Sequence, residues 1–336
     1  MASTIHDVAR LAGVSAGTVS RVINNSPRVD PATRARVLQV IEDLDFRPSV
    51  TARRLSTGRT HSIGVVTPTF TRPSVVERLR GISGVLISTE YELVVYNVET
   101  IEQRNHALDV LTRGDRADGL LLVGLGPSDD ELARLEQGSL ACVLVDAEHE
   151  RLTSIVGNDV AGGRLAARHL LSLGHRKIAY VGEKPRETFN TPASVLRQQG
   201  ITLELLAQGL DLYPHYSAVG EQGRGRAREL AAALLSLSDP PTGILCASDV
   251  QALGVLEAAR DAGLSVPRDV SIVGYDDLEM AAYLGLTTVR QPLFESGMQG
   301  ARLLVEQLNG GSRSPRRELV RIEVVERSTS GPPPDD

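Results

Sequence analysis

The chain has 336 residues, of which 41% are hydrophobic, enough for two or three domains that each bury an apolar core. The first 20 residues mix charged with apolar side chains, and no segment approaches the roughly 18 consecutive apolar residues of a membrane-spanning helix. We therefore expect neither secretion nor membrane insertion, and place the protein in the cytoplasm. Two cysteines, Cys142 and Cys246, lie in apolar runs far apart in the sequence, which argues against a disulfide scaffold and a four-ligand zinc cluster, and no metal or other cofactor is expected.

Charge is distributed unevenly along the chain. The formal net charge is −6, yet residues 1–60 contain nine arginines and only five acidic residues. This N-terminal stretch therefore has a net charge of +4, and the rest of the chain has a net charge of −10. A basic stretch of this length is by itself more often a solvated surface than a nucleic-acid footprint. The pattern within the stretch decides between the two.

Two short helices are predicted first. Thr4 with Asp7 three residues later forms a capping-box pattern, and the helix that follows ends at Gly13. Ser15 is placed to cap a second helix whose outward positions are polar. The inward positions of the second helix are Val19, Val22 and Ile23.

A third helix is predicted from Asp30-Pro31, a cap residue followed by proline at the first helical position. Its apolar stripe consists of Val37, Val40, Ile41 and Leu44. The three elements have the spacing of a helix-turn-helix with a supporting third helix. Such a unit places the N-terminal end of its second helix in the DNA major groove, where Ser, Thr and Asn side chains meet phosphates.

The string TIHDVARLAGVSAGTVSRVINNSPRVDPATRARVLQVIEDLDFRPS (residues 4–49) closely resembles the DNA-binding head of the lactose-repressor (LacI/GalR) family of bacterial regulators. The resemblance implies that Ser15, Thr18 and Asn24 hold phosphates and that Arg21 reads a base. The family's two variable specificity positions are Ala16 and Gly17 here, and neither offers a side-chain hydrogen bond. We therefore expect Arg21 and the following hinge to carry an unusually large share of sequence specificity. The DNA-binding set predicted within residues 1–46 is Thr4, Ser15, Ala16, Gly17, Thr18, Ser20, Arg21, Asn24 and Arg28.

Residues 47–60 are basic and polar with one large apolar residue, Leu55. A flexible linker would have this composition too. The string ARRL, however, is similar to the family's hinge helix, which folds on the operator and inserts paired leucines into the minor groove. The resemblance makes Leu55 the wedge residue, with Ala52 and Arg53 lining the groove.

Beyond residue 60 apolar runs alternate with helical stretches, among them 161–173 and 250–263. Strands buried on both faces and separated by helices predict parallel sheets wound in βαβ units. The runs are SIGVV (62–66), ELVVYNV (92–98), GLLLVG (119–124), ACVLVD (141–146), KIAYVG (177–182), GILCAS (243–248) and SIVGYD (271–276). Ligands of such sheets gather at the carboxyl ends of strands, where Asp146, Ser248 and Asp276 fall.

This body resembles the family's effector domain, which is similar to periplasmic sugar-binding proteins, through LGHRKIAYVG, CASD, VPRDVSIVGYDD and LTTVRQP. The resemblance implies two lobes joined by three crossings, near residues 155–160, near 288–292 and after Arg317. The domains predicted are a helix-turn-helix head (1–46), a hinge (47–60), and an effector-binding and dimerisation domain (61–330), followed by a disordered Pro-rich tail (331–336). The N-lobe is predicted to comprise 61–159 and 289–318, and the C-lobe 160–288 and 319–330.

The resemblance also assigns a small-molecule effector to the cleft between the lobes. An arginine with two carboxylates suits a polyhydroxylated ligand, although each residue could instead form an ordinary strand-end salt bridge. The expected contacts are Phe70, Arg72, Asp146, Arg197, Ser248 and Asp276. The chain departs from the family in its missing second aromatic after the first strand, in the order Asn158-Asp159 and in having no Trp. The ligand is thus left open among a sugar, a sugar phosphate, a nucleoside or none, with Arg72 and Arg186 as the candidate cations for a phosphate.

Catalysis is disfavoured by the sequence. GLGPSD (124–129) lacks the third glycine of a dinucleotide-binding loop, and neither a nucleophile elbow nor an HExxH motif occurs. An alternative is a sugar-binding transport-type protein, which would have no use for the head. We expect a cytoplasmic, nucleoid-associated repressor that binds a palindromic double-stranded DNA operator as a homodimer, under allosteric control of a sugar or related metabolite. The leucine heptads that form the family's tetramers are missing.

Overall fold

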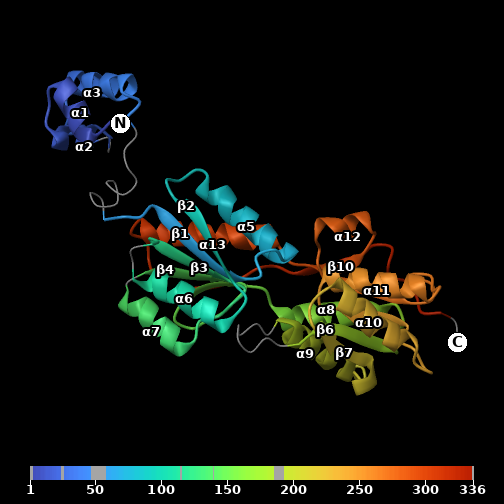
Figure 1. The fold of residues 1–336 in the computed structure, drawn as a ribbon. Coiled ribbons are helices and arrows are strands. Elements are labelled where there is room, and N and C mark those ends of the chain that lie inside the picture. Colours follow the sequence, from blue (N-terminus) through green and yellow to red (C-terminus); the bar gives the residue numbers. More distant parts are fainter. Residues whose placement is uncertain are drawn as a thin grey trace. The chain divides into compact units, whose positions relative to one another are not determined.

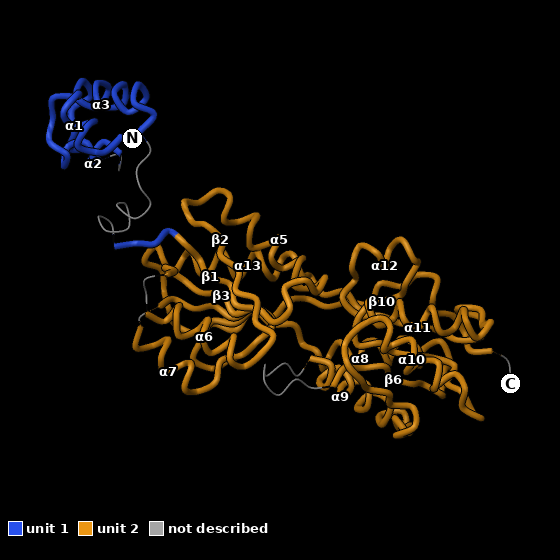
Figure 2. Tube along the Cα trace, viewed as in Figure 1, with its two compact units in different colours: residues 1–61 blue, residues 62–336 orange. Residues whose placement is uncertain are grey.

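The structure is a computed structural model that describes residues 3–23, 26–46, 58–113, 116–138, 140–184 and 193–334. The chain divides into two compact units, residues 1–61 and 62–336, shown in different colours in Figure 2. Within the described ranges no helix is both long and apolar enough to cross a membrane.

Unit 1 is a three-helix cluster, as the sequence predicts. Its helices are α1 (Ile5–Ala12), α2 (Ala16–Ile23) and α3 (Pro31–Asp43). All three predicted N-caps are confirmed: Thr4 forms a capping box, the Ser15 hydroxyl accepts from a backbone N–H of α2, and the Asp30 carboxylate accepts from two N–H groups of α3. Gly13 ends α1 in the left-handed conformation at φ 65°. The buried core is Val8, Ala9, Ala12, Val19, Val22, Val37 and Phe46.

The predicted hinge falls almost wholly at residues 47–57, outside the described residues. The same holds for its three proposed DNA contacts Ala52, Arg53 and Leu55, and for Asn24 of the head.

Unit 2 consists of two lobes, each built on a six-stranded, mainly parallel sheet (Figure 1). The first sheet has the strand order β11-β5-β4-β3-β1-β2 and the second β12-β10-β9-β8-β6-β7. This is the two-lobed α/β class that the sequence predicts, and only the pairing of β10 with β12 is antiparallel among the strand pairs described.

The first lobe contains β1 (Ser62–Pro68), α5 (Pro73–Leu86), β2 (Glu92–Val98), α6 (Ile101–Thr112), β3 (Gly119–Val123), α7 (Asp129–Gln137), β4 (Ala141–Val145), β5 (Thr153–Val156), α13 (Leu293–Leu308) and β11 (Arg317–Leu319). Alternate residues of β3 enter different cores, Leu120 and Leu122 on the side of α6 and α7, and Leu121 and Val123 on the side of α5 and α13. Burial of both faces explains why this strand is an uninterrupted apolar run. β2 is an exception, because it lies at the sheet edge and is largely exposed; the expectation of burial on both faces is wrong there.

The second lobe contains α8 (Asp159–Ser172), β6 (Ile178–Glu183), α9 (Ala193–Leu206), the 3-10 turn η2 (Pro214–Tyr216), β7 (Ser217–Gly220), α10 (Arg224–Leu235), β8 (Gly243–Cys246), α11 (Asp249–Asp261), β9 (Ser271–Asp276), α12 (Glu279–Tyr283), β10 (Thr287–Arg290) and β12 (Glu323–Val325). The chain passes between the lobes after β5, after β10 and after β11. The three crossings leave the strand ends of both sheets facing a common cleft.

Each lobe has helices that cross at glycines. On α5 and α13, a Cβ at Gly81 would lie 2.0 Å from the carbonyl oxygen of Phe294, and one at Gly297 would lie 2.1 Å from that of Arg78. On α8 and α9, a Cβ at Gly163 would lie 2.0 Å from the carbonyl oxygen of Arg197. The helices of each pair therefore approach backbone to backbone, which only glycine allows.

The segment after residue 330 is ordered where the structure describes it. The backbone of Gly331 donates to Ser271 Oγ at 3.0 Å and accepts from His175 Nε2 at 2.9 Å. The expectation of a disordered tail from residue 331 is therefore wrong at its start, because two buried side chains of the second lobe hold the backbone.

Candidate DNA interface and effector cleft

The first turn of α2 is open to solvent on the side where the sequence predicts DNA contacts. Ser15, Gly17 and Arg21 are exposed, whereas Val19 and Val22 face the core. The hydroxyls of Ser15 and Thr18 lie 3.0 Å apart, so the two predicted phosphate contacts form one polar cluster at the helix start. Backbone N–H groups at a helix start and such hydroxyls are the groups that bind phosphate oxygens.

Gly17 is not required by packing. A Cβ at this position would meet only Ser15 Oγ, at 3.7 Å, and its φ lies outside the left-handed region. The missing side chain therefore leaves free space beside Arg21, one helical turn further along the same face. Of the other predicted DNA contacts, Ala16 and Ser20 are half-buried, Thr4 is exposed with its hydroxyl bonded to Asp7, and Arg28 is exposed.

Two adjoining cavities, of about 350 Å³ and about 90 Å³, lie between the lobes of unit 2. Arg72, Ser74, Arg78, Asp146 and Ala193 line both. The predicted contacts Arg197, Ser248 and Asp276 line the smaller cavity. Phe70 lines neither; its side chain is 45% exposed, and its backbone N–H donates to Asn97 Oδ1.

Arg197 is held rigidly on α9. Its Nε donates to Asp159 Oδ1 at 2.8 Å, one terminal nitrogen donates to the carbonyl oxygen of Ala247 at 2.5 Å, and its guanidinium lies 3.7 Å from the centroid of the Tyr275 ring. Hydrogen bonds at its edge and an aromatic ring against its face together fix the orientation of the guanidinium plane. The residue order Asn158-Asp159 is explained here, because Asn158 caps α8 while Asp159 binds Arg197.

Asp276 stands at the end of β9 with φ 118°, a backbone conformation that a non-glycine residue rarely adopts. Its Oδ1 accepts from Gln291 Nε2 at 2.8 Å. Burial raises the pKa of this carboxyl to about 6, against the opposing effect of the Arg197 guanidinium. Strain and burial of one carboxylate at a strand end are typical of a ligand-binding position.

Asp146, at the end of β4 with φ 60°, forms an ion pair with Arg78 of 2.9 Å. Burial raises the pKa of the Asp146 carboxyl, and Arg78 opposes the rise. Arg72 reaches across the cleft to Glu183 of the second lobe, at 3.6 Å. This ion pair joins the lobes directly and would break if the cleft opened.

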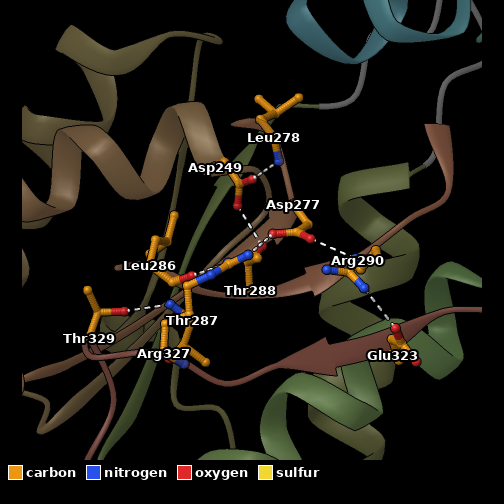
Figure 3. A network of polar contacts seen from close by, with 10 residues as sticks. All are labelled: Asp249, Asp277, Leu278, Leu286, Thr287, Thr288, Arg290, Glu323, Arg327 and Thr329. Atoms are coloured by element: carbon orange, nitrogen blue, oxygen red, sulfur yellow. Dashed lines mark hydrogen bonds and ion pairs between the residues drawn. The ribbon is translucent and has the colours of Figure 1, made fainter. Parts of the chain in front are cut away.

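A second polar network fixes the crossing strands behind Asp276 (Figure 3). Asp249 Oδ1 accepts from the Thr288 hydroxyl at 2.6 Å and Oδ2 from the backbone N–H of Leu278 at 2.7 Å. Asp277 binds both Arg290, at 2.7 Å, and Arg327, at 2.6 Å. Burial raises the pKa of Asp249 to about 8. The network ties the end of β9 to β10 and to the chain after β12, so it positions Asp276.

The cleft contains residues that the sequence analysis missed, chiefly Arg78, Asp159, Glu183 and Gln291. Arg78 left one signal in the sequence, since it occupies the apolar stripe of α5 between Val75 and Ile82. The others have partners that are remote in sequence and become neighbours only through the fold. Within the described part of the chain no group of three or more metal-ligating side chains occurs.

These features define a class of protein: a helix-turn-helix unit joined to a two-lobed α/β domain with a polar interlobe cleft. Residues 4–49 match the lacI family of bacterial regulatory proteins, and residues 167–330 match the periplasmic binding protein-like domain. The HTH-type transcriptional repressor PurR of Aliivibrio salmonicida (strain LFI1238) is 32% identical over 334 residues, covering 97% of this chain and 98% of the relative. The ribose operon repressor of Escherichia coli (strain K12) is 33% identical over 336 residues, with coverage of 98% and 100%.

A solved structure is similar over nearly the whole chain. The lac repressor dimer bound to operator and the anti-inducer ONPF superposes with a TM-score of 0.85 at 26% identity, covering 98% of this chain and all of the other. The chain therefore belongs to the LacI family of bacterial regulatory proteins. It is a DNA-binding transcriptional repressor with an effector-binding domain and not an enzyme, and the transport-type alternative is set aside.

Proposed function

We propose that this repressor acts in the cytoplasm at the nucleoid, binds a palindromic operator as a homodimer, and responds to a small polyhydroxylated metabolite held between its lobes. The observation that supports this best is the convergence of Arg197, Asp146 and Asp276 on adjoining interlobe cavities. Carboxylates accept from hydroxyl groups while a guanidinium donates to them, so the set suits vicinal hydroxyls. The larger cavity has the volume of a small-metabolite site.

The body of the protein offers a surface for dimerisation. Ile87 at the end of α5 is 86% exposed, Tyr283 on α12 is 92% exposed, and β2 is an unpaired edge with Val94 and Val95 on it. An exposed strand edge can pair with another chain, and several exposed apolar side chains on one side of a domain favour a contact with a partner. In Figure 1, β2, α5 and α12 all lie toward the upper side of unit 2.

We expect sedimentation of the full chain at micromolar concentration to give a dimer. Tyr283→Asp should weaken the dimer at least about tenfold, because it places a charge in a buried apolar contact. Tyr213→Asp is the matched control, since Tyr213 is exposed on the second lobe and should leave the dimer unchanged. A stable tetramer, or equal dimer strength in both variants, would contradict the proposal.

The operator is testable by selecting random duplex DNA with the purified protein at two salt concentrations, because phosphate-driven affinity falls steeply with salt. We expect a two-fold symmetric site with a pyrimidine–purine step at its centre. Arg21→Ala should relax discrimination at one base pair of each half-site by roughly 5- to 150-fold, the value of an Arg fork on guanine.

Arg10→Ala is the control for that experiment, because it removes the same charge from an exposed position on α1. It should lower affinity for all sequences alike and keep the selected site. An Arg21→Ala protein that selects the same operator as the unaltered protein would disprove the assigned role.

A further inference from the structure

The N-terminus of α5 opens into the larger cavity without a side-chain cap. Its N-cap residue is Arg72, which makes no capping hydrogen bond, and Pro73 has no N–H. The next two residues, Ser74 and Val75, line the cavity. Their backbone N–H groups belong to the first turn of a 14-residue helix, where intrahelical acceptors are lacking and the helix dipole is positive.

Arg78, one turn further along α5, lines the same cavity although it is only 3% exposed. One terminal nitrogen binds Asp146 Oδ1 at 2.9 Å and the other donates to the carbonyl oxygen of Ser74 at 3.3 Å. Its Nε is buried and has no hydrogen-bond partner in the described part of the chain. Nε and a terminal nitrogen together form the fork by which arginine takes two oxygens of one anion, and here Nε is unused.

The carboxylates around the larger cavity do not oppose an added anion. Asp146 is paired with Arg78, Asp159 with Arg197 at 2.8 Å, and Glu148 with Arg317 at 2.5 Å. Every acidic side chain that lines this cavity thus has an arginine partner among the described residues. The partial positive charge of the helix start and the Nε–H of Arg78 have no counterpart among the residues that the structure describes.

We propose that the larger cavity binds an oxyanion carried by the effector, which makes the ligand a sugar acid or a sugar phosphate. The Ser74 and Val75 N–H groups and Arg78 Nε hold the anionic group, while the hydroxyls reach Arg197 and Asp276 in the adjoining cavity. This inference rests on the proposed function, because it names the chemical class of the same effector.

The test compares neutral sugars with their charged counterparts on the full chain by calorimetric titration at constant ionic strength: glucose with glucose 6-phosphate and glucuronate, ribose with ribose 5-phosphate, and inorganic phosphate alone. We expect at least one charged compound to bind tenfold or more tightly than its neutral partner. Arg78→Met should weaken binding of the charged compound by roughly 10- to 100-fold more than binding of its neutral partner. The phosphate and carboxylate members show which oxyanion the site takes.

Arg78→Lys is a second variant that keeps a cation beside Asp146 and tests the proposal if the methionine variant misfolds. Because lysine lacks the guanidinium fork, we expect affinity for the charged compound to fall fivefold or more. Arg80→Gln is the matched control on the same helix, because Arg80 is exposed and paired with Glu77. Equal affinity for charged and neutral members, no binding of any member, or charged binding that is insensitive to Arg78 would overturn the inference. If charged compounds bind through Arg78 yet leave operator affinity unchanged, the inference stands and the effector role fails.

Discussion

Replacing Gly163 by alanine is expected to destabilise the second lobe by about 3 to 5 kcal/mol. The new Cβ would lie 2.0 Å from the carbonyl oxygen of Arg197 and 2.9 Å from its carbonyl carbon. Backbone atoms cannot rotate away as a side chain does, so α8 and α9 must separate. Gly200 makes the reciprocal contact, 2.0 Å from the carbonyl oxygen of Val160, so the strain extends to both helices.

Thermal unfolding of the full chain measures this effect, and a fall in Tm of about 10 °C is expected for a domain of this size. Gly225→Ala is the matched control, because Gly225 lies in α10 with nothing within 4 Å of its added Cβ, and it should stabilise by about 0.5 to 1 kcal/mol. If the Gly163 variant melts with the unaltered protein, the helices are not in backbone contact. A variant that remains folded should bind its effector more weakly, since the displaced residue carries the Arg197 guanidinium.

The helix caps and most strands were predictable because their signals are local. Thr4, Ser15 and Asp30 satisfy N–H groups two or three residues away, so spacing alone identifies them. Strand β7, SAVG, was missed because it is short and only partly buried, and β2 was placed wrongly in the interior because its apolar residues lie on a sheet edge. An edge strand and a central strand of similar composition differ only in what lies beside them.

The cleft was predictable only in part, for a related reason. Asp146, Ser248 and Asp276 follow buried strands, and the carboxyl ends of parallel strands meet at one edge. Their partners Arg78 and Gln291 come from helices and crossings elsewhere in the chain. Of these cleft residues, Arg78 could have been predicted from the sequence, because a charged residue within the apolar stripe of an amphipathic helix must have a buried partner.

The glycines at the helix crossings pack on the backbone of the same arginines that line the cleft. Gly297 of α13 packs on the backbone of Arg78, and Gly163 of α8 packs on the backbone of Arg197. Each lobe thus presents one buried arginine to the cleft from a helix that a glycine contact holds in place. The position of each guanidinium is set by backbone contact as well as by its ion pair, with Asp146 in one lobe and with Asp159 in the other.

Asp276→Asn is expected to make the protein more stable and less responsive to its effector. Burial raises the pKa of the Asp276 carboxyl from 3.8 to about 6, so between pH 4 and pH 6 the folded state holds a proton that the unfolded state has lost. The free energy of unfolding contributed by this group therefore falls as pH rises through that window. Asparagine carries no such penalty, tolerates a positive φ and still accepts from Gln291 through its amide oxygen.

Urea unfolding of both proteins between pH 4 and pH 8 measures the difference. The variant should match the unaltered protein near pH 4, gain steadily to pH 6 and hold an advantage of about 1 to 3 kcal/mol above pH 7. Asp211→Asn, at an exposed loop position, is the control and should differ by less than about 0.5 kcal/mol throughout. An advantage that is constant with pH, or that shrinks as pH rises, would contradict the burial of an ionised Asp276.

The same substitution should weaken the effect of the ligand on operator binding by roughly 10- to 100-fold, because a ligand hydroxyl loses a charged acceptor. The substitution should therefore raise the free energy of unfolding while it weakens the response of operator binding to the ligand. A misfolded variant would lose both. The strained backbone of Asp276, at φ 118°, also indicates a functional role, because the fold holds a carboxylate where both burial and backbone conformation disfavour it. A carboxylate that costs stability is expected where a bound ligand supplies a further hydrogen-bond donor.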